Sequence, residues 1–458
     1  MRLGIATRLG LSLGIAVGSA LGVASARAEE APAVEKAPSV RESIGPLGDP
    51  GGWRAAGEAR GIAASLIYTS EVLGNLTGGF RRHTIFAGKL DAQLSVDLGK
   101  VAGLPGLAFF ANVFQLHDTG GMRDRTFGRL ITVSNIEAYP TTRLSELWLE
   151  QKWAEDRWGL RLGQLTADGE FFSADYGRLF LSNDWPTFTG ANLPSGGPAY
   201  PLSTPGIRLR ADPSPDWSGL LAVFNGDPGD QRDRNKDGLR FPVRDPALVM
   251  AEVQYRYGQE KDADRLAGAW RLGAFHRLGR FDDVRFDRTG LALSHPASSG
   301  VARRLRGTSG IYGVLDHQLW RPEGGSREDG VALYARLAAG PSDRSHVDLW
   351  ADGGIVVSGL VPGRPHDKFG ASFIYARIGE ALRSADRNAR MYGAAFQPMR
   401  SYEATLELSY GAQIIPGWVV QPDVQWVYRP SGGIENPRRP GTLLKGGTII
   451  GLRSTITY

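Results

Sequence analysis

One long stretch, residues 167–204, carries side chains suited to binding a polar solute. It combines acidic, amide and aromatic residues, namely Asp168, Glu170, Asn183, Asp184, Trp185 and Phe188. Carboxylates accept hydrogen bonds and amides both donate and accept them. A high density of aromatic rings is unusual in a connection that is only surrounded by water. We therefore expect this connection to fold inward and narrow a passage, although each ring could serve only to attach the connection to the wall.

Two further sets of charged residues lie at or beside segments with alternating polarity. The first set is Arg81, Arg82, Lys89 and Asp91; the second is Glu146, Trp148, Glu150 and Lys152, which share one phase. Basic groups facing acidic groups across a water-filled passage create a transverse field that orients polar solutes. The alternative for each charge is a solvated wall position without an individual role.

An acidic segment resembles half of a calcium loop. Asp233, Asn235 and Asp237 have the D-x-N-x-D-G spacing, and Asp227 and Asp230 lie nearby. The twelfth position of a complete EF-hand loop would be Arg244, where a bidentate Glu is needed, so an EF-hand is excluded. The remaining alternatives are a structural calcium site made by these oxygens and an ordinary acidic surface turn. We expect no other cofactor.

The composition argues against several other functions. The seven His are scattered, and neither H-E-x-x-H nor G-x-S-x-G occurs. The formal net charge is +5, and loss of Arg2, Arg8 and Arg27 with the first 28 residues leaves +2. A charge this small does not favour a nucleic-acid partner.

The amino-terminal 28 residues have the features of a secretory signal. Basic residues precede an apolar run from Leu9 to Ala24, and Ala26-Arg27-Ala28 matches an A-x-A cleavage site. The alternative is an uncleaved membrane anchor. After residue 28 no apolar run reaches the ~18 residues of a spanning helix. We expect residues 29–60 to form a periplasmic lead-in, with a mobile, Pro- and charge-rich first part (29–50), and residues 61–458 to form the folded unit.

Polarity alternates with a period of two along most of residues 61–458, which is typical of strands with one face in lipid. The pattern predicts strands at 61–72, 84–98, 107–117, 142–153, 157–166, 205–211, 217–225, 247–257, 269–277, 310–320, 330–338, 347–360, 367–377, 401–412, 418–428 and 446–458. Short and long connections mostly alternate, as they do in outer-membrane barrels. We therefore predict an all-β fold, a sixteen-stranded antiparallel transmembrane β-barrel with an inward-folded constriction loop. A soluble β-sandwich or propeller is the alternative.

Four segments in the expected order resemble the carbohydrate-selective outer-membrane porins of the glucose porin B type. They are GDPGGWRAAGEARGI (48–62), TTRLSELWLEQKW (141–153) with LRLGQLTADGEFF (160–172), VALYARLAAG (331–340) with GLVPGRPHDKFGASF (359–373), and YEATLELSYGAQIIPGWVVQPDVQWVYRPSGG (402–433) with GLRSTITY. The resemblance implies a sixteen-stranded porin in the outer membrane of a Gram-negative bacterium. It also implies uptake of monosaccharides such as glucose and, often, a homotrimer. For such a ligand we expect Trp185 to stack on the ring and Asp184 to bind hydroxyls.

Other functions stay open at this point. A general or small-anion diffusion porin is the main alternative, and an outer-membrane barrel enzyme or an adhesin is the lesser one. The last strand adds an expectation about assembly: Leu452, Ile456 and Tyr458 should face lipid, whereas Arg453, Thr455 and Thr457 should face the channel. The terminal Tyr458 resembles the signal by which the barrel assembly machinery recognises its clients.

Overall fold

The computed structural model describes residues 38–458 except 184, 186–191, 231, 233–234, 260–264, 327 and 394–395. Within these residues sixteen strands follow one another along the chain. They are β1 (Ile62–Asn75), β2 (His83–Asp97), β3 (Leu107–Asp118), β4 (Thr141–Trp153), β5 (Trp158–Leu165), β6 (Thr204–Ser214), β7 (Trp217–Asn225), β8 (Ala247–Tyr257), β9 (Gly268–Asp287), β10 (Ala302–Trp320), β11 (Gly330–Ala339), β12 (Val347–Ser358), β13 (Lys368–Ile378), β14 (Tyr402–Ile415), β15 (Trp418–Tyr428) and β16 (Gly447–Thr457).

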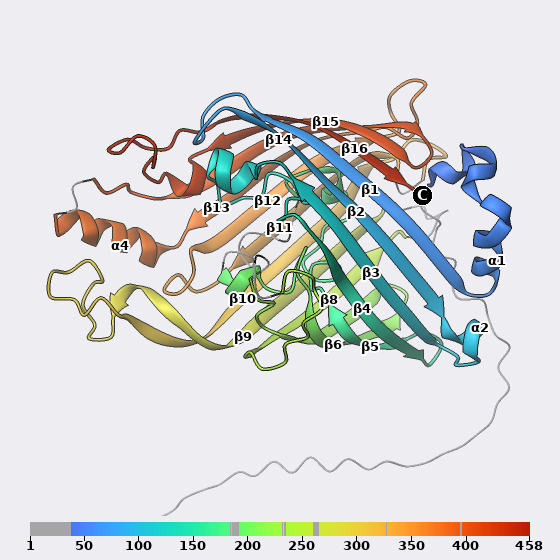
Figure 1. Cartoon of the computed structure of the whole chain (residues 1–458), viewed down its shortest axis with the longest axis horizontal. Helices are drawn as coiled ribbons and strands as arrows, with labels where there is room; N and C mark the ends of the chain where they lie inside the picture. Colours follow the sequence, from blue (N-terminus) through green and yellow to red (C-terminus); the bar gives the residue numbers. More distant parts are fainter. Residues whose placement is uncertain are drawn as a thin grey trace, which may run out of the picture. The chain divides into compact units, whose positions relative to one another are not determined.

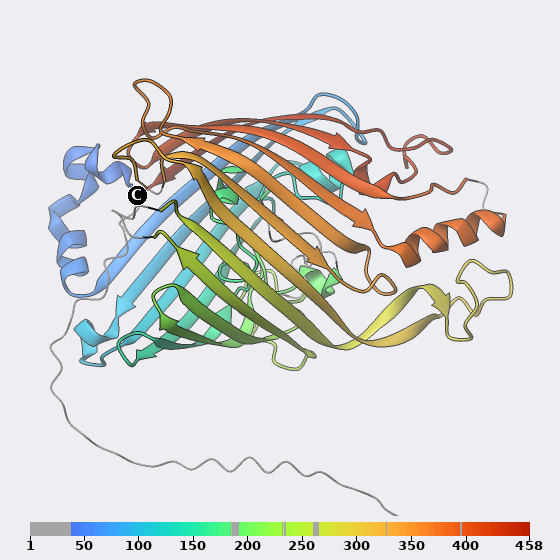
Figure 2. The ribbon, with the colours of Figure 1, turned by 180° about the vertical axis from the view of Figure 1, so that it is seen from behind.

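Every strand pairs antiparallel with its neighbours in sequence, and β1 also pairs with β16, so the sheet closes on itself (Figures 1 and 2). The closing register runs from Asn75 opposite Ile449 to Ile67 opposite Thr457. Closure removes both free edges of the sheet. The predicted all-β, sixteen-stranded antiparallel barrel is therefore confirmed. Among the described residues no helix has both the length and the apolar character needed to cross a membrane.

The two faces of the sheet differ in chemistry, because successive side chains point to opposite sides. On the outer face large apolar side chains are exposed, as for Leu272 (71%) and Ile311 (66%). On the inner face charged and amide side chains are buried, including Glu252, Arg336 and Arg453. Arg453 pairs with Glu71 and donates to Asn135, while Leu452 and Ile456 are exposed. The expected orientation of these three residues in the last strand is confirmed.

The part of the lead-in that the structure describes is folded. Three short 3-10 helices, η1 (Val40–Glu42), η2 (Gly45–Gly48) and η3 (Pro50–Gly52), precede α1 (Trp53–Ala59). The hydroxyl of Tyr458 donates to the carbonyl of Leu47 at 2.7 Å, and the Arg54 guanidinium lies 4.6 Å from the Tyr458 ring centroid. Residues 38–50 are thus packed against the end of the barrel, and the Tyr458 side chain, which was expected to face lipid, contacts the lead-in.

Two connections contain more regular structure than the alternation predicted. β9 and β10 continue to Asp287 and from Ala302, ten and eight residues beyond their predicted ends, and form a projecting hairpin (Figures 1 and 2). The connection after β13 contains α4 (Glu380–Met391). Arg285 on the hairpin donates to Asn388 on α4 at 3.1 Å. Beyond the membrane neither face of a hairpin meets lipid, so the regular apolar alternation that predicts a strand is absent there.

The other helices in the described ranges are short. They are α2 (Leu98–Ala102), the π-helical turn η4 (Met122–Phe127), and the 3-10 turns η5 (Tyr176–Leu179), η6 (Pro194–Gly196) and η7 (Pro430–Gly432).

Candidate functional site

The connection between β5 and β6 is bound to the inner wall at three points far apart around the ring. Glu252 on β8 accepts the backbone N–H of Phe172 at 2.8 Å. Asp316 on β10 accepts those of Asp175 and Tyr176, both at 3.0 Å. Glu407 on β14 accepts that of Leu181 at 2.6 Å. A segment that leaves β5 and reaches all three strands must cross the interior. The described part of this connection, here called the inner loop (residues 166–203), therefore folds inward as expected.

Aromatic side chains hold the inner loop to the wall. The Phe172 ring stacks on Tyr312 of β10 with centroids 4.4 Å apart, and Phe171 meets Phe224 of β7 edge-on at 6.3 Å. Phe172 has φ +57°, a conformation that few residues with a side chain adopt. Stacking and the hydrogen bond to Glu252 hold it there. Backbone strain of this kind persists only where the surrounding contacts fix it.

Trp185 belongs to this apolar core and does not present a free stacking face. Its side chain is 6% exposed, and its indole N–H donates to the carbonyl of Phe171 at 3.2 Å. The expectation that Trp185 stacks on a solute is therefore corrected: in this structure the ring packs the inner loop. Its expected partner Asp184, and Phe188, lie outside the described residues.

A second connection, between β3 and β4 (residues 119–140), also reaches the inner wall, which the sequence did not predict. The Arg129 guanidinium pairs with Glu403 of β14 at 3.3 Å and donates to Gln425 of β15 at 3.0 Å. Glu403 also accepts the backbone N–H groups of Leu130 and Ile131. The sequence does contain an indication of this contact: the run Leu130-Ile131-Thr132-Val133 is too apolar for a loop that is fully exposed to water.

A small cavity of about 190 Å³ lies between the wall and the start of the inner loop, and two of the predicted residues, Glu146 and Asp168, line it. Its lining is Phe114, Ser145, Glu146, Thr166, Asp168, Gly169 and Tyr200. The Lys89 ammonium lies 5.1 Å from the Phe114 ring centroid and 5.0 Å from that of Tyr200. We call these lining residues together with Lys89 the selectivity chamber. Asp168 also fixes the chamber's shape, because it accepts the backbone N–H of Tyr200 at 2.7 Å.

Beside the chamber, the predicted residues Trp148 and Glu170 belong to a charged cluster on the wall. The Arg161 guanidinium lies 3.8 Å from the Trp148 ring centroid. Arg208 bridges Glu150 of the wall at 2.9 Å and Glu170 of the inner loop at 2.7 Å. Trp148 thus lies in the interior as predicted. Arg161 and Arg208 were not predicted as interior residues. Each lies between two outward-facing apolar residues (Leu160 and Leu162; Ile207 and Leu209), and strand alternation places such a residue on the inner face.

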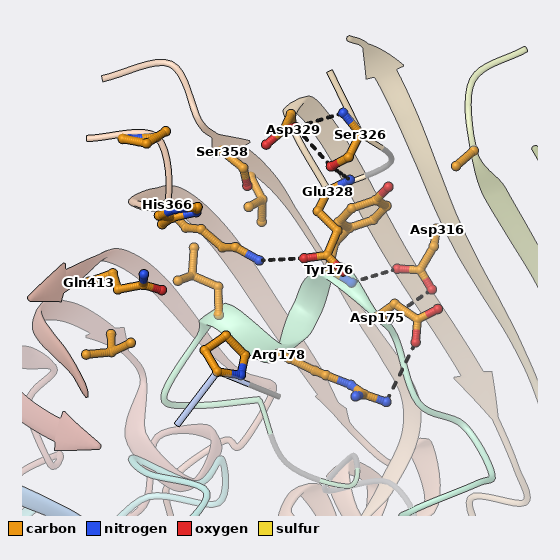
Figure 3. Close-up of a pocket in the computed structure, with 18 of the residues that line it drawn as sticks. Asp175, Tyr176, Arg178, Asp316, Ser326, Glu328, Asp329, Ser358, His366 and Gln413 are labelled. Atoms are coloured by element: carbon orange, nitrogen blue, oxygen red, sulfur yellow. Dashed lines mark hydrogen bonds and ion pairs between the residues drawn. The ribbon is translucent and has the colours of Figure 1, made fainter. Parts of the chain in front are cut away.

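A larger cavity of about 940 Å³ lies on the other side of the inner loop, toward the barrel end that carries the short turns. Asp175, Tyr176 and Arg178 of the loop line this cavity together with Glu328 and His366 of the short turns, and Figure 3 shows Arg178 directed toward Asp175. Arg271 of β9 pairs with Asp175 at 2.6 Å, and with Asp316.

The other predicted residues are more dispersed. Arg81 and Arg82 lie in the connection between β1 and β2, and neither lines either cavity. Asp91 is on the inner wall, where it accepts from Gln93 at 3.1 Å. Asn183 belongs to the inner loop but lines neither cavity. Arg143 was missed: it is 1% exposed on β4, and its three guanidinium nitrogens have no hydrogen-bond partner among the described residues.

The described residues of the acidic segment 227–237 form turns whose backbone contacts β4. Asp227 accepts from the backbone N–H of Gly229 at 2.9 Å, and Asp230 from that of Arg232 at 2.7 Å. The backbone carbonyl of Asp237 accepts from the N–H of Leu144 on β4 at 2.9 Å. Within the described part of the chain no cluster of three metal-ligating side chains occurs. Asp233 lies outside it, so the calcium site at Asp227, Asp230, Asp233, Asn235 and Asp237 stays a prediction.

Comparison with known proteins places this architecture in a family. The family model described as carbohydrate-selective porin, OprB family, matches residues 81–458. Porin B of Pseudomonas aeruginosa is 23% identical over 403 residues, covering 84% of this chain and 87% of that protein. The putative porin QuiX of Acinetobacter baylyi is 19% identical over 406 residues, covering 84% and 88%.

A solved structure shows the same fold. The high-pH structure of Pseudomonas putida OprB superposes with a TM-score of 0.76 at 19% identity, covering 90% of this chain and 97% of that one. Together, the closed barrel and the family match show which class of protein this chain belongs to and in which membrane it lies. The chain belongs to the OprB family of carbohydrate-selective porins, and it is an outer-membrane sugar channel of a Gram-negative bacterium, not an enzyme.

Proposed function

We propose that the channel passes monosaccharides such as glucose and that it selects them in the selectivity chamber. The observation that carries this proposal is the combination of two carboxylates, two aromatic rings and one ammonium around one small cavity. At about 190 Å³ the chamber is smaller than the ~300–1,000 Å³ of pockets for drug-sized ligands. It therefore suits a solute of one sugar ring better than an oligosaccharide.

The lining supplies both kinds of contact that a sugar needs. Glu146 and Asp168 accept hydrogen bonds from hydroxyl groups, and the Lys89 ammonium donates to hydroxyl oxygens. Phe114 and Tyr200 offer apolar ring surface to the C–H groups of the sugar. Conduction requires that the sugar also leaves, and partly exposed, water-filled sites of this kind bind weakly enough for that.

The charge balance favours a neutral solute over a small anion. Lys89 is opposed by three carboxylates, those of Asp91, Glu146 and Asp168, on the same stretch of wall and loop. An anion entering the chamber would come close to these carboxylates as well as to Lys89, and like charges repel each other strongly in a low-dielectric lining. A small-anion porin would instead concentrate unpaired Arg or Lys at its narrowest point.

The proposal is tested by measuring glucose block of single channels in planar bilayers for Glu146→Gln. Hydrogen bonds to charged groups contribute about 1.5–3 kcal/mol. A loss of about 1.4 kcal/mol from this interaction should raise the half-blocking glucose concentration about tenfold. Glu328→Gln is the matched control, because it makes the same carboxyl-to-amide change in the larger cavity.

The expected result is weaker block in Glu146→Gln and unchanged block in Glu328→Gln. Equal shifts in both variants would mean that overall lumen charge governs the block, and the chamber would lose its role. Stronger block by small organic anions than by glucose in the wild type would favour the anion porin instead.

A further inference from the structure

On the outer face of the projecting β9–β10 hairpin, exposed apolar residues are followed by exposed arginines, at the same height on both strands. On β9 the outward positions Trp270, Leu272 and Leu278 are 56%, 71% and 48% exposed. The next outward position is Arg280, which is also exposed. On β10 the exposed Ile311 and Ser309 are followed by the exposed Arg306. On each strand, an exposed arginine therefore lies just beyond the exposed apolar residues of the outer face.

The height of this arginine pair coincides with the edge of the membrane. Arg280 lies ten residues along β9 from Trp270, which is near the short-turn end. With a rise of ~3.4 Å per residue and a strand tilt of ~40°, this is about 26 Å along the membrane normal. The apolar band of an outer-membrane barrel is ~25 Å tall. Arg280 thus lies at the level where lipid headgroups begin, on the side of the long connections.

A β-bulge brings the two arginines directly opposite each other. The register shifts between Arg306 and Thr308, and Arg306 becomes the cross-strand partner of Arg280. Gly307 at the bulge has φ +62°, and Arg344 fixes the bulge by donating to the carbonyls of Arg306 and Gly307 at 2.8 and 2.6 Å. Bulges commonly redirect a side chain in this way.

Like charges directly opposite in a β-ladder are destabilising. Within the described residues neither Arg280 nor Arg306 forms an ion pair with a carboxylate, whereas the neighbouring Arg304 pairs with Asp282 at 2.7 Å. The pair is therefore left with two positive charges that an external anion would neutralise. Guanidinium groups bind phosphate oxygens in bidentate geometry, which makes a phosphate the anion that fits best.

We propose that Arg280 and Arg306 bind a phosphate group of the phosphorylated glycolipid in the outer leaflet. The acyl chains of that lipid lie on the apolar residues below the pair, including Leu278 and Ile311. Free phosphate would gain the ionic contacts without this apolar contact, which favours the lipid as the source of the anion.

The experiment measures binding of bisphosphorylated lipid A to the purified, folded full chain in detergent by native mass spectrometry. The variant is Arg280→Gln with Arg306→Gln. The matched control is Arg438→Gln with Arg439→Gln, which removes the same charge from two exposed arginines in the connection between β15 and β16. Removing a repulsive pair should not unfold the hairpin, and the heat-dependent gel shift of the barrel checks that each variant is folded.

We expect at least tenfold weaker lipid A binding in the Arg280/Arg306 variant and unchanged binding in the control. Dephosphorylated lipid A should bind the wild type as weakly as lipid A binds the variant. Equal binding of lipid A to the wild type and the variant would overturn the proposal, as would displacement of lipid A by millimolar inorganic phosphate. Glucose block should be the same in all three proteins, so this result is independent of the sugar site.

Discussion

Replacing Asp316 by Asn should release part of the inner loop from the wall. The Asp316 carboxylate is 2% exposed and accepts the backbone N–H groups of Asp175 and Tyr176 while pairing with Arg271. Asn keeps one acceptor oxygen, so one charge-assisted bond of about 1.5–3 kcal/mol is lost. Breaking a buried ion pair costs about 3–5 kcal/mol. Because Arg271 keeps Asp175 as a partner, we expect a total loss of about 3–5 kcal/mol.

The assay combines single-channel recording with thermal unfolding. Asp352→Asn is the matched control: it also breaks a buried wall pair, with Arg336 at 2.7 Å, but among the described residues it accepts no backbone N–H of the inner loop. Both variants should melt earlier than the wild type. Only Asp316→Asn should show higher conductance, more open-channel noise and weaker sugar block. Wild-type conductance and noise in Asp316→Asn, together with lower stability, would refute the idea that wall carboxylates hold the loop.

Three further predictions concern other parts of the fold. Trp185→Ala should cost about 3–5 kcal/mol of stability, because the buried ring leaves a cavity, whereas Trp185→Phe should cost less; lost glucose block at unchanged melting temperature would restore the stacking role. Burial raises the pKa of Glu137 to about 7. The β3–β4 connection (residues 119–140) is therefore stabilised by neutral Glu137. This stabilisation is fully present below pH ~4.5, the pKa of an unfolded Glu, and is lost as the pH rises through 7. Hydrogen exchange in residues 119–140, corrected for intrinsic rates, should show this loss, and Glu137→Gln should abolish it. Deleting Tyr458 should slow insertion of the barrel into membranes, whereas Arg54→Ala should leave insertion normal and lower the melting temperature; equal insertion defects would contradict separate roles.

The strands were predictable because lipid imposes a period of two on the sequence. β7, β8 and β15 agree with the predicted bounds residue for residue, and the others mostly within one to three residues. The signal fails where the lipid ends, as in the outer halves of β9 and β10 and in α4. There neither face of an element meets an apolar phase, so hydrophobic periodicity carries no information.

The candidate site was predictable only as a set of residue types. Lys89, Glu146 and Asp168 lie at one cavity, as their placement on inward phases and on the inner loop suggested. Which aromatic rings join them depends on contacts between residues far apart in sequence. Tyr200 completes the chamber because Asp168 binds its backbone, and Trp185 is turned away because it is buried and its indole N–H donates to the carbonyl of Phe171. No local pattern distinguishes these two outcomes.

The most direct test of the central claim is titration of glucose and a disaccharide against single wild-type channels in planar bilayers. A chamber built for one sugar ring should give saturable block by glucose at a lower half-blocking concentration than by the disaccharide. An ohmic channel whose current is indifferent to both sugars would contradict the account.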